Sequence, residues 1–157
     1  MSARSPAPVR AAGLAIGMGM GGFVDGIVFH QIPQLHNMLS ARVPNDVLVG
    51  AKVNMVWDGV FHAGVWLLTA FGIALLWRAC RRPDALLSTR LLIGAMLAGW
   101  GVFNLVEGVV DHFLLQVHHV VEVLGLSIWD YAFLGWGLAM LLGGIALMRG
   151  ARTRAVA

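Results

Sequence analysis

Four long apolar segments constrain the fold of this chain more than any other feature. Each is long enough to cross the roughly 30 Å hydrocarbon core of a bilayer as a helix, which takes about 20 residues. They lie at residues 11–32, 55–78, 89–112 and 128–148. Of the 157 residues, 59% are hydrophobic and only 12% are charged, and a soluble domain of this size could not bury so much apolar surface. The sequence therefore predicts an all-α integral membrane protein, a four-helix bundle forming one domain.

Polar segments bound the predicted helices. Residues 1–10 and 150–157 are basic tails that we expect to be disordered. The third helix is expected to continue beyond the membrane as far as residue 124, where a glycine follows that can stop it. Ser127 and Asp130 match a helix-capping pattern, so the fourth helix should begin there. We find no convincing internal repeat in the sequence.

The basic residues predict the orientation of the helices. Nine arginines fall on one side of the predicted membrane, whereas only Arg42 and Lys52 fall on the other. Because cytoplasmic loops are enriched in Lys and Arg, both termini and the loop 79–88 are predicted to be cytoplasmic. The single cysteine, Cys80, would then lie on the reducing side and cannot form an internal disulfide. No basic stripe with interleaved aromatic residues is present, so nucleic-acid binding is not indicated.

Acidic and histidine side chains gather at one depth in three of the predicted helices. Counting about 1.5 Å per residue from the cytoplasmic arginine of each helix places them in a slab roughly 22 to 33 Å away. Ionisable groups at membrane depth are costly, so they are expected to face the interior and to mark function. The slab holds Asp25 and His30 on the first helix, Asp58 and His62 on the second, and Glu107, Asp111 and His112 on the third.

This set of side chains predicts a transition-metal site that could hold one or two ions. Carboxylate and imidazole ligands together suit Zn, Cu, Fe and Mn, and we expect copper or zinc first. Ligands from several helices meet in this way in four-helix metal proteins. Asp25 and His30 face the same way only if the helix distorts near Gly26, because five residues turn an α-helix by about 140°. We expect the side chains around the ligands or along the access route to be Asn54, Asn104, His118 and His119.

Two other functions remain open. Metal bound in a cleft that opens outward would permit a metal-dependent membrane enzyme, either an oxidoreductase or a hydrolase. Chains of acids and histidines also conduct protons or cations, so a coupled carrier is the second alternative. Four helices are few for alternating access, so a carrier would require a homo-oligomer. The expected partners are the lipid bilayer and either a second copy of the chain or a periplasmic or membrane protein.

Three motifs carry a resemblance to a known family: GFVDGIVFHQI (22–32), WDGVFHAG (57–64) and FNLVEGVVDHFLLQVHHV (103–120). Their D-G-x-x-x-H and E-G-x-x-D-H spacings resemble an uncharacterised family of small, predicted four-helix bacterial membrane proteins with a domain of unknown function. The resemblance covers roughly residues 10–150. It implies a bacterial inner-membrane protein and brings no established activity. The expected role of the metal site is metal (copper) handling or oxidase assembly. The chain lacks the Glu-x-x-His pairs of di-iron carboxylate bundles, so a site of that type is in doubt.

Overall fold

The structure is a computed structural model that describes residues 4–153, with side chains described up to residue 151. The outer ends of the predicted tails, residues 1–3 and 154–157, lie outside the described residues. Four helices are present, and each is long and apolar enough to cross a membrane by length and composition. This confirms the prediction of an all-α membrane protein with four helices. The helices are α1 (Ala7–Asp25), α2 (Leu48–Cys80), α3 (Thr89–Glu107) and α4 (Ile128–Thr153), and α1 and α3 continue directly into the π-helices η1 (Gly26–Gln31) and η2 (Gly108–Leu114).

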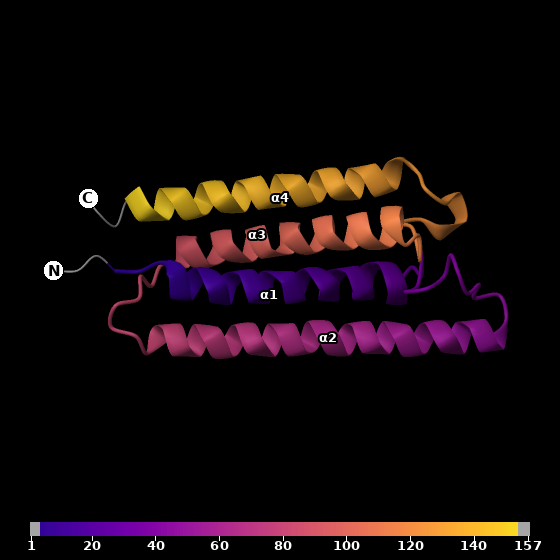
Figure 1. The fold of residues 1–157 in the computed structure, drawn as a ribbon, viewed down its shortest axis with the longest axis horizontal. Helices are drawn as coiled ribbons and strands as arrows, with labels where there is room; N and C mark the ends of the chain where they lie inside the picture. The colour runs from indigo at the N-terminus through magenta and orange to yellow at the C-terminus, as the bar shows by residue number, and fades with distance from the viewer. Residues whose placement is uncertain (1–3, 154–157) are drawn as a thin grey trace.

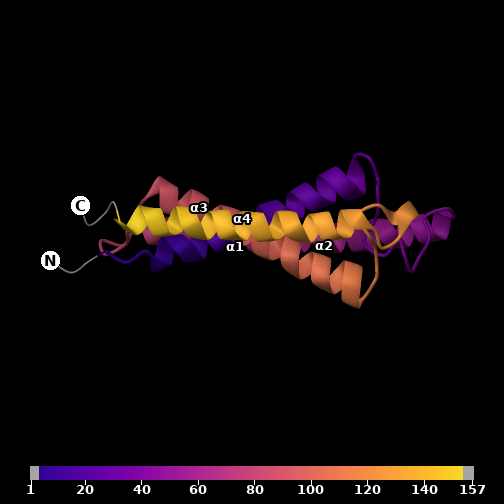
Figure 2. The same ribbon diagram turned by 90° about the horizontal axis from the view of Figure 1, so that it is seen from above.

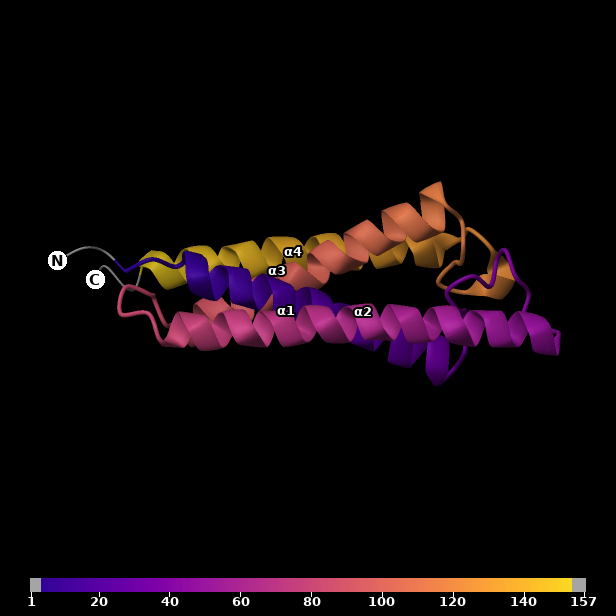
Figure 3. The ribbon, with the colours of Figure 1, turned by 60° about the horizontal axis from the view of Figure 1, so that its bottom comes forward.

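The two central helices, α1 and α3, pack against each other, and α2 and α4 flank them on opposite sides (Figure 1). Among the described helices, α2 packs on α1 and η1, α4 packs on α3 and η2, and α2 does not pack on α4. The central pair cross and then diverge towards η1 and η2 (Figure 2). The loops 32–47 and 115–127 fold over this diverging end (Figure 3). Two backbone hydrogen bonds join them, because the amides of Ala41 and Glu122 donate to the carbonyls of Val117 and Leu35.

The start of α1 and the end of α4 lie at the opposite end of the molecule, beside the loop 81–88 (Figure 1). The polar side chains of interest are therefore far from the chain ends. The placement of both termini on the cytoplasmic side remains a prediction from the basic residues.

Glycines allow α1 and α3 to approach closely. A Cβ atom on Gly17 would overlap the Met96 carbonyl oxygen, and one on Gly99 would overlap the Leu14 carbonyl oxygen. Small residues four apart let helix backbones meet in this way in membranes. The glycine spacing in the first and third apolar segments therefore encodes the central helix pair.

The hairpins α1–α2 and α3–α4 repeat one another, so the sequence expectation of no repeat is wrong. The segments FVDGIVFHQIPQLH (23–36) and LVEGVVDHFLLQVH (105–118) align without a gap and share six of 14 residues. Equivalent positions make equivalent contacts: Gly17 meets α3 as Gly99 meets α1. The two described non-glycine residues with positive φ, Gln34 at 51° and Gln116 at 48°, also correspond. The flanking helices α2 and α4 align with Asp58 opposite Asp130, and the two hairpins are related by an approximate twofold repetition.

Several helix boundaries differ from the sequence prediction. The third helix ends at Leu114 and does not continue to residue 124; only a short 3-10 turn, η3 (Glu122–Leu124), follows it. The left-handed backbone at Gln116 is the physical reason, because it cannot continue a right-handed helix. The helix α1 begins at Ala7, so part of the predicted N-terminal tail is helical. Likewise α4 extends past residue 150. The helix α2 contains the whole of its predicted spanning part, 55–78, and agrees with the prediction.

Candidate metal centre

The π-helices η1 and η2 turn acidic and histidine side chains towards each other. In a π-helix the backbone hydrogen bonds join residues five apart, and such segments are frequent at functional sites. Asp25 and His30 are five residues apart, as are Glu107 and His112, and each pair spans the start of a π-helix. The helix distortion that the sequence required near Gly26 is therefore present, and the same distortion recurs at the equivalent Gly108.

In the first half of the molecule, His30 lies between two carboxylates. Its Nε2 atom is 3.2 Å from Asp25 Oδ2, and its Nδ1 atom is 2.9 Å from Asp58 Oδ1. All three side chains are buried. Asp58 also accepts hydrogen bonds from the Met38 amide at 2.8 Å and from the Asn37 side chain at 2.7 Å. The loop 32–47 thus fixes the carboxylate that orients His30.

The second half repeats this arrangement around His112. Its Nε2 atom is 3.0 Å from Glu107 Oε1, and its Nδ1 atom is 3.0 Å from Asp130 Oδ1. Asp130 is fully buried and also accepts hydrogen bonds from the amides of Val120 and Ser127. The predicted capping role of Asp130 is therefore confirmed, and the same carboxylate also holds His112.

Two loop histidines, His36 and His118, close the centre between the halves. Their rings stack with centroids 4.5 Å apart and an angle of 4° between the planes. Each is tied to the opposite loop, because His36 Nδ1 is 3.1 Å from the Val120 carbonyl and His118 Nδ1 is 3.1 Å from the Met38 carbonyl. His118 Nε2 lies 2.8 Å from Glu107 Oε1, whereas the buried His36 Nε2 has no hydrogen-bond partner among the described residues.

The four central histidines share one geometry. Each has its Nδ1 atom at a carboxylate or carbonyl acceptor on the outer side and its Nε2 atom directed inward. A neutral imidazole that donates from Nδ1 presents the lone pair of Nε2, which is how most metal-binding histidines are held. Ligand atoms of His30, His36 and His118 lie within 4.8 Å of one another, as do those of Glu107, His112 and His118. These side chains could hold a transition-metal ion.

The electrostatics of the centre require positive charge. Four carboxylates are buried here, and buried charges need partners. Burial, reinforced by the nearby His118 and His30, lowers the pKa of His36 to about 2, so its imidazole is neutral. Burial also opposes charge on His118, but the hydrogen bond with Glu107, the negative charges of Glu107 and Asp25 and the Met38 carbonyl together outweigh it and raise the pKa of His118. Besides protonation of a buried acid itself, protons on histidine and a bound cation are the ways in which this centre can balance its acids, Asp25, Asp58, Glu107 and Asp130.

The structure brings together four of the seven predicted ligands, namely Asp25, His30, Glu107 and His112. The carboxylate of Asp58 contacts His30 from the outer side. Two predicted ligands lie apart from the centre. His62 Nδ1 is 2.7 Å from the carbonyl of Asp58 in its own helix. Asp111 is half-buried, and its carboxylate belongs to neither group of three ligand atoms.

The residues predicted around the ligands have different places. Asn54 is buried and holds the loop 32–47, because it accepts a hydrogen bond from the Leu39 amide and donates to the Val43 carbonyl. Asn104 is buried where α3 meets α4 at Gly137. His118 is buried and belongs to both groups of ligand atoms, so it lies among the candidate ligands and not only around them. His119 is buried next to them, with Nδ1 3.6 Å from Asp130 Oδ1.

Sequence reasoning missed His36 and Asp130 as members of the centre. The signal that could have found His36 is the repeat itself, because the aligned segments 23–36 and 105–118 both end on a histidine. The same alignment, extended to the flanking helices, pairs the Trp-Asp at 57–58 with that at 129–130. Asp130 would then have been predicted as the counterpart of Asp58.

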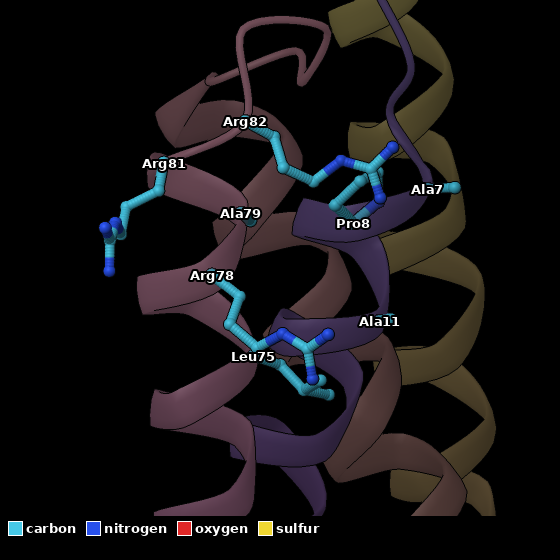
Figure 4. A pocket seen from close by; sticks show the side chains of 8 residues that line it. All are labelled: Ala7, Pro8, Ala11, Leu75, Arg78, Ala79, Arg81 and Arg82. Atoms are coloured by element: carbon cyan, nitrogen blue, oxygen red, sulfur yellow. The ribbon is translucent and has the colours of Figure 1, made fainter.

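A cavity of about 600 Å³ lies between α1 and α2, at the end of the molecule opposite the histidine centre (Figure 4). Arg78 and Arg82 extend across it towards α1, while Arg81 points away. Arg82 is paired with Asp84 at 2.8 Å. A cavity lined by guanidinium groups repels metal cations, so it does not compete with the histidine centre as a metal site.

Comparison with known proteins agrees with this fold. A family model described as "Predicted membrane protein (DUF2243)" matches residues 12–151. The chain belongs to this family. DUF2243 membership confirms the resemblance seen in the three sequence motifs and identifies a membrane protein, while its description gives no activity. No curated protein and no solved structure matches the chain.

Proposed function

We propose that this DUF2243 protein binds a transition-metal ion at the end of the helices farthest from the chain termini. The proposed ligands are the inward Nε2 atoms of the four central histidines together with two carboxylates: His30, His36, His112, His118, Asp25 and Glu107. Asp58 and Asp130 would orient the rings of His30 and His112 from outside. We further propose the bacterial inner membrane as its location and metal handling, including supply for oxidase assembly, as its role.

One observation favours a bound metal ion over a network made only of charged side chains. His36 Nε2 and Glu107 Oε2 are both buried without a hydrogen-bond partner among the described residues. Protons on His30, His112 and His118 can satisfy the other carboxylate oxygens but leave these two atoms unpaired, which is costly in a buried site. A cation held by His30, His36 and His118 would give His36 Nε2 a partner, and one held by Glu107, His112 and His118 would give Glu107 a partner.

The distances in the centre are close to those that an ion needs. Ligands bonded to a tetrahedral ion at about 2.1 Å lie about 3.4 Å from one another. Glu107 Oε1 is 3.0 Å from His112 Nε2 and 2.8 Å from His118 Nε2. For these two pairs, movements of about half an ångström would reach the spacing around an ion. The ligands offer nitrogen and oxygen, which favours copper or zinc, with iron or manganese as further candidates.

Elemental analysis of the purified full-length protein tests this proposal. After growth with added copper and zinc, we expect at least about one transition-metal ion per chain, lost in Glu107→Gln and kept in Asp84→Asn. Asp84 is exposed in the loop 81–88, so Asp84→Asn is a matched removal of a carboxylate charge away from the centre. Background metal in the wild type would refute the metal site. Proton transport by proteoliposomes in the presence of a chelator would instead support the carrier.

A further inference from the structure

The two halves of the molecule differ at one place beside the proposed metal centre. In the first half a pocket of about 340 Å³ opens between η1 and the outer face of α2. Asp58 lines it, and this same carboxylate contacts His30 at 2.9 Å. The pocket therefore adjoins the centre through a single side chain. Its lining residues are Gln31, Met55, Asp58, Gly59 and His62.

The equivalent place in the second half is filled. Asp130 corresponds to Asp58 and is retained, but every other lining residue is replaced. Phe113 and Tyr131 stand where the first half has Gln31 and Gly59, and their rings pack edge to face with centroids 5.2 Å apart. The remaining replacements are Ser127 for Met55 and Leu134 for His62. The pocket is thus a feature of one half that the common fold does not require.

Two of the residues that distinguish the pocket, Met55 and His62, are of types that bind metals. Met55, Asp58 and His62 are spaced i, i+3 and i+7 along α2, so they share one face of the helix. The Met55 side chain is 69% exposed. His62 has its Nδ1 atom 2.7 Å from the Asp58 carbonyl, so its Nε2 atom is presented for binding, as in the four central histidines. Met55 and His62 lie about 10 Å apart along the helix axis, and both line the same pocket. A thioether and an imidazole in one pocket suit Cu(I).

We propose that Met55 and His62 form a surface site that receives Cu(I) and passes it to the central histidines by ligand exchange, without a change of oxidation state. This inference rests on the metal-binding function proposed above. Of the candidate metals, copper is the one that suits both the thioether–imidazole pair and the imidazole-rich centre. In the second half an aromatic pair stands at the equivalent place, and neither a thioether nor an imidazole replaces Met55 and His62 there, so the route that we propose runs through the first half.

Copper loading of the full-length protein in detergent tests this site. Metal-free protein is mixed with Cu(I) held by a coloured chelator, and both the final copper content and the rate of transfer are recorded. We expect His62→Leu and Met55→Ser, which install the residues of the second half, to slow loading about tenfold with unchanged final copper. Gly59→Tyr should slow loading equally by filling the pocket, since a side chain at Gly59 meets no neighbour. The control Met20→Leu removes an exposed methionine elsewhere and should load at the wild-type rate.

The outcomes separate the two proposals. If the wild type takes up no copper at equilibrium, the Cu(I) surface site is refuted, and the central metal site fails as well only if zinc also stays at background. If copper content is normal but all three pocket variants load as fast as the wild type, the surface site is refuted while the centre stands. If His62→Leu and Met55→Ser lose bound copper at equilibrium, these residues belong to the storage site and the transfer role is wrong.

Discussion

Replacing His36 by phenylalanine separates a metal centre from a structural network. In the metal-free protein the change removes the hydrogen bond to the Val120 carbonyl, worth about 1 kcal/mol, and also removes a buried unpartnered nitrogen, which costs about 1–3 kcal/mol. The aromatic ring can keep its stacking on His118 and Phe29. These terms nearly cancel, so we expect the free energy of unfolding without metal to stay within about 1 kcal/mol of the wild type.

Metal binding should respond very differently to the same change. At a free metal concentration of 100 times Kd, binding stabilises the wild type by about 2.7 kcal/mol. A hundredfold weaker Kd in His36→Phe would reduce that stabilisation to about 0.4 kcal/mol at the same concentration. Thermal unfolding followed by circular dichroism, with and without Zn²⁺, measures both quantities. The control His119→Phe alters a buried neighbour outside both ligand groups and should keep the metal effect. A destabilised metal-free His36→Phe that retains the full metal effect would refute the reasoning.

Three further predictions concern other parts of the molecule. Glu107→Gln should abolish stabilisation by metal while leaving the helix content unchanged, and a retained melting shift on adding Zn²⁺ would contradict its role as a ligand. Gly17→Val should destabilise the protein by about 1–3 kcal/mol through overlap with α3, whereas Gly64→Val, where a side chain meets nothing, should be near neutral in chemical unfolding. The pKa of His36 falls from 6.5 when unfolded to about 2 when folded, so only the unfolded form gains a proton as the pH drops to 5. The free energy of unfolding of the metal-free wild type should therefore fall by about 2 kcal/mol more than that of His36→Phe between pH 7.5 and pH 5. Equal losses in the two proteins would show that His36 is not buried as a neutral imidazole.

The apolar segments predict the helices well, because spanning length and glycine spacing are written locally in the sequence. The π-helices are not predictable in the same way, since they depend on backbone hydrogen bonds between residues five apart and have no composition of their own. Estimating depth from the number of residues along a helix also places every residue beyond the helix end outside the membrane. This estimate misses His36 and His118, because the loops turn back inward at Gln34 and Gln116. These two residues adopt left-handed backbone without the usual glycine.

The repeat was hidden by unequal connections. The central helices are 82 residues apart, as Asp25 and Glu107 show, whereas the flanking helices are 72 apart, as Asp58 and Asp130 show. A search for a repeat at one fixed spacing therefore aligns either the central helices or the flanking helices, but not both. Contacts that recur in both halves recover it.

X-ray absorption at the metal edge tests the central claim most directly, on full-length protein loaded with one equivalent of Zn²⁺ or Cu(I). We predict a first shell of nitrogen and oxygen at about 2.0–2.1 Å with outer scattering from at least three imidazole rings. One imidazole should be lost in His36→Phe. A shell dominated by sulfur at about 2.3 Å, or a spectrum that is the same in His36→Phe, would contradict a centre built from the inward nitrogens of four histidines.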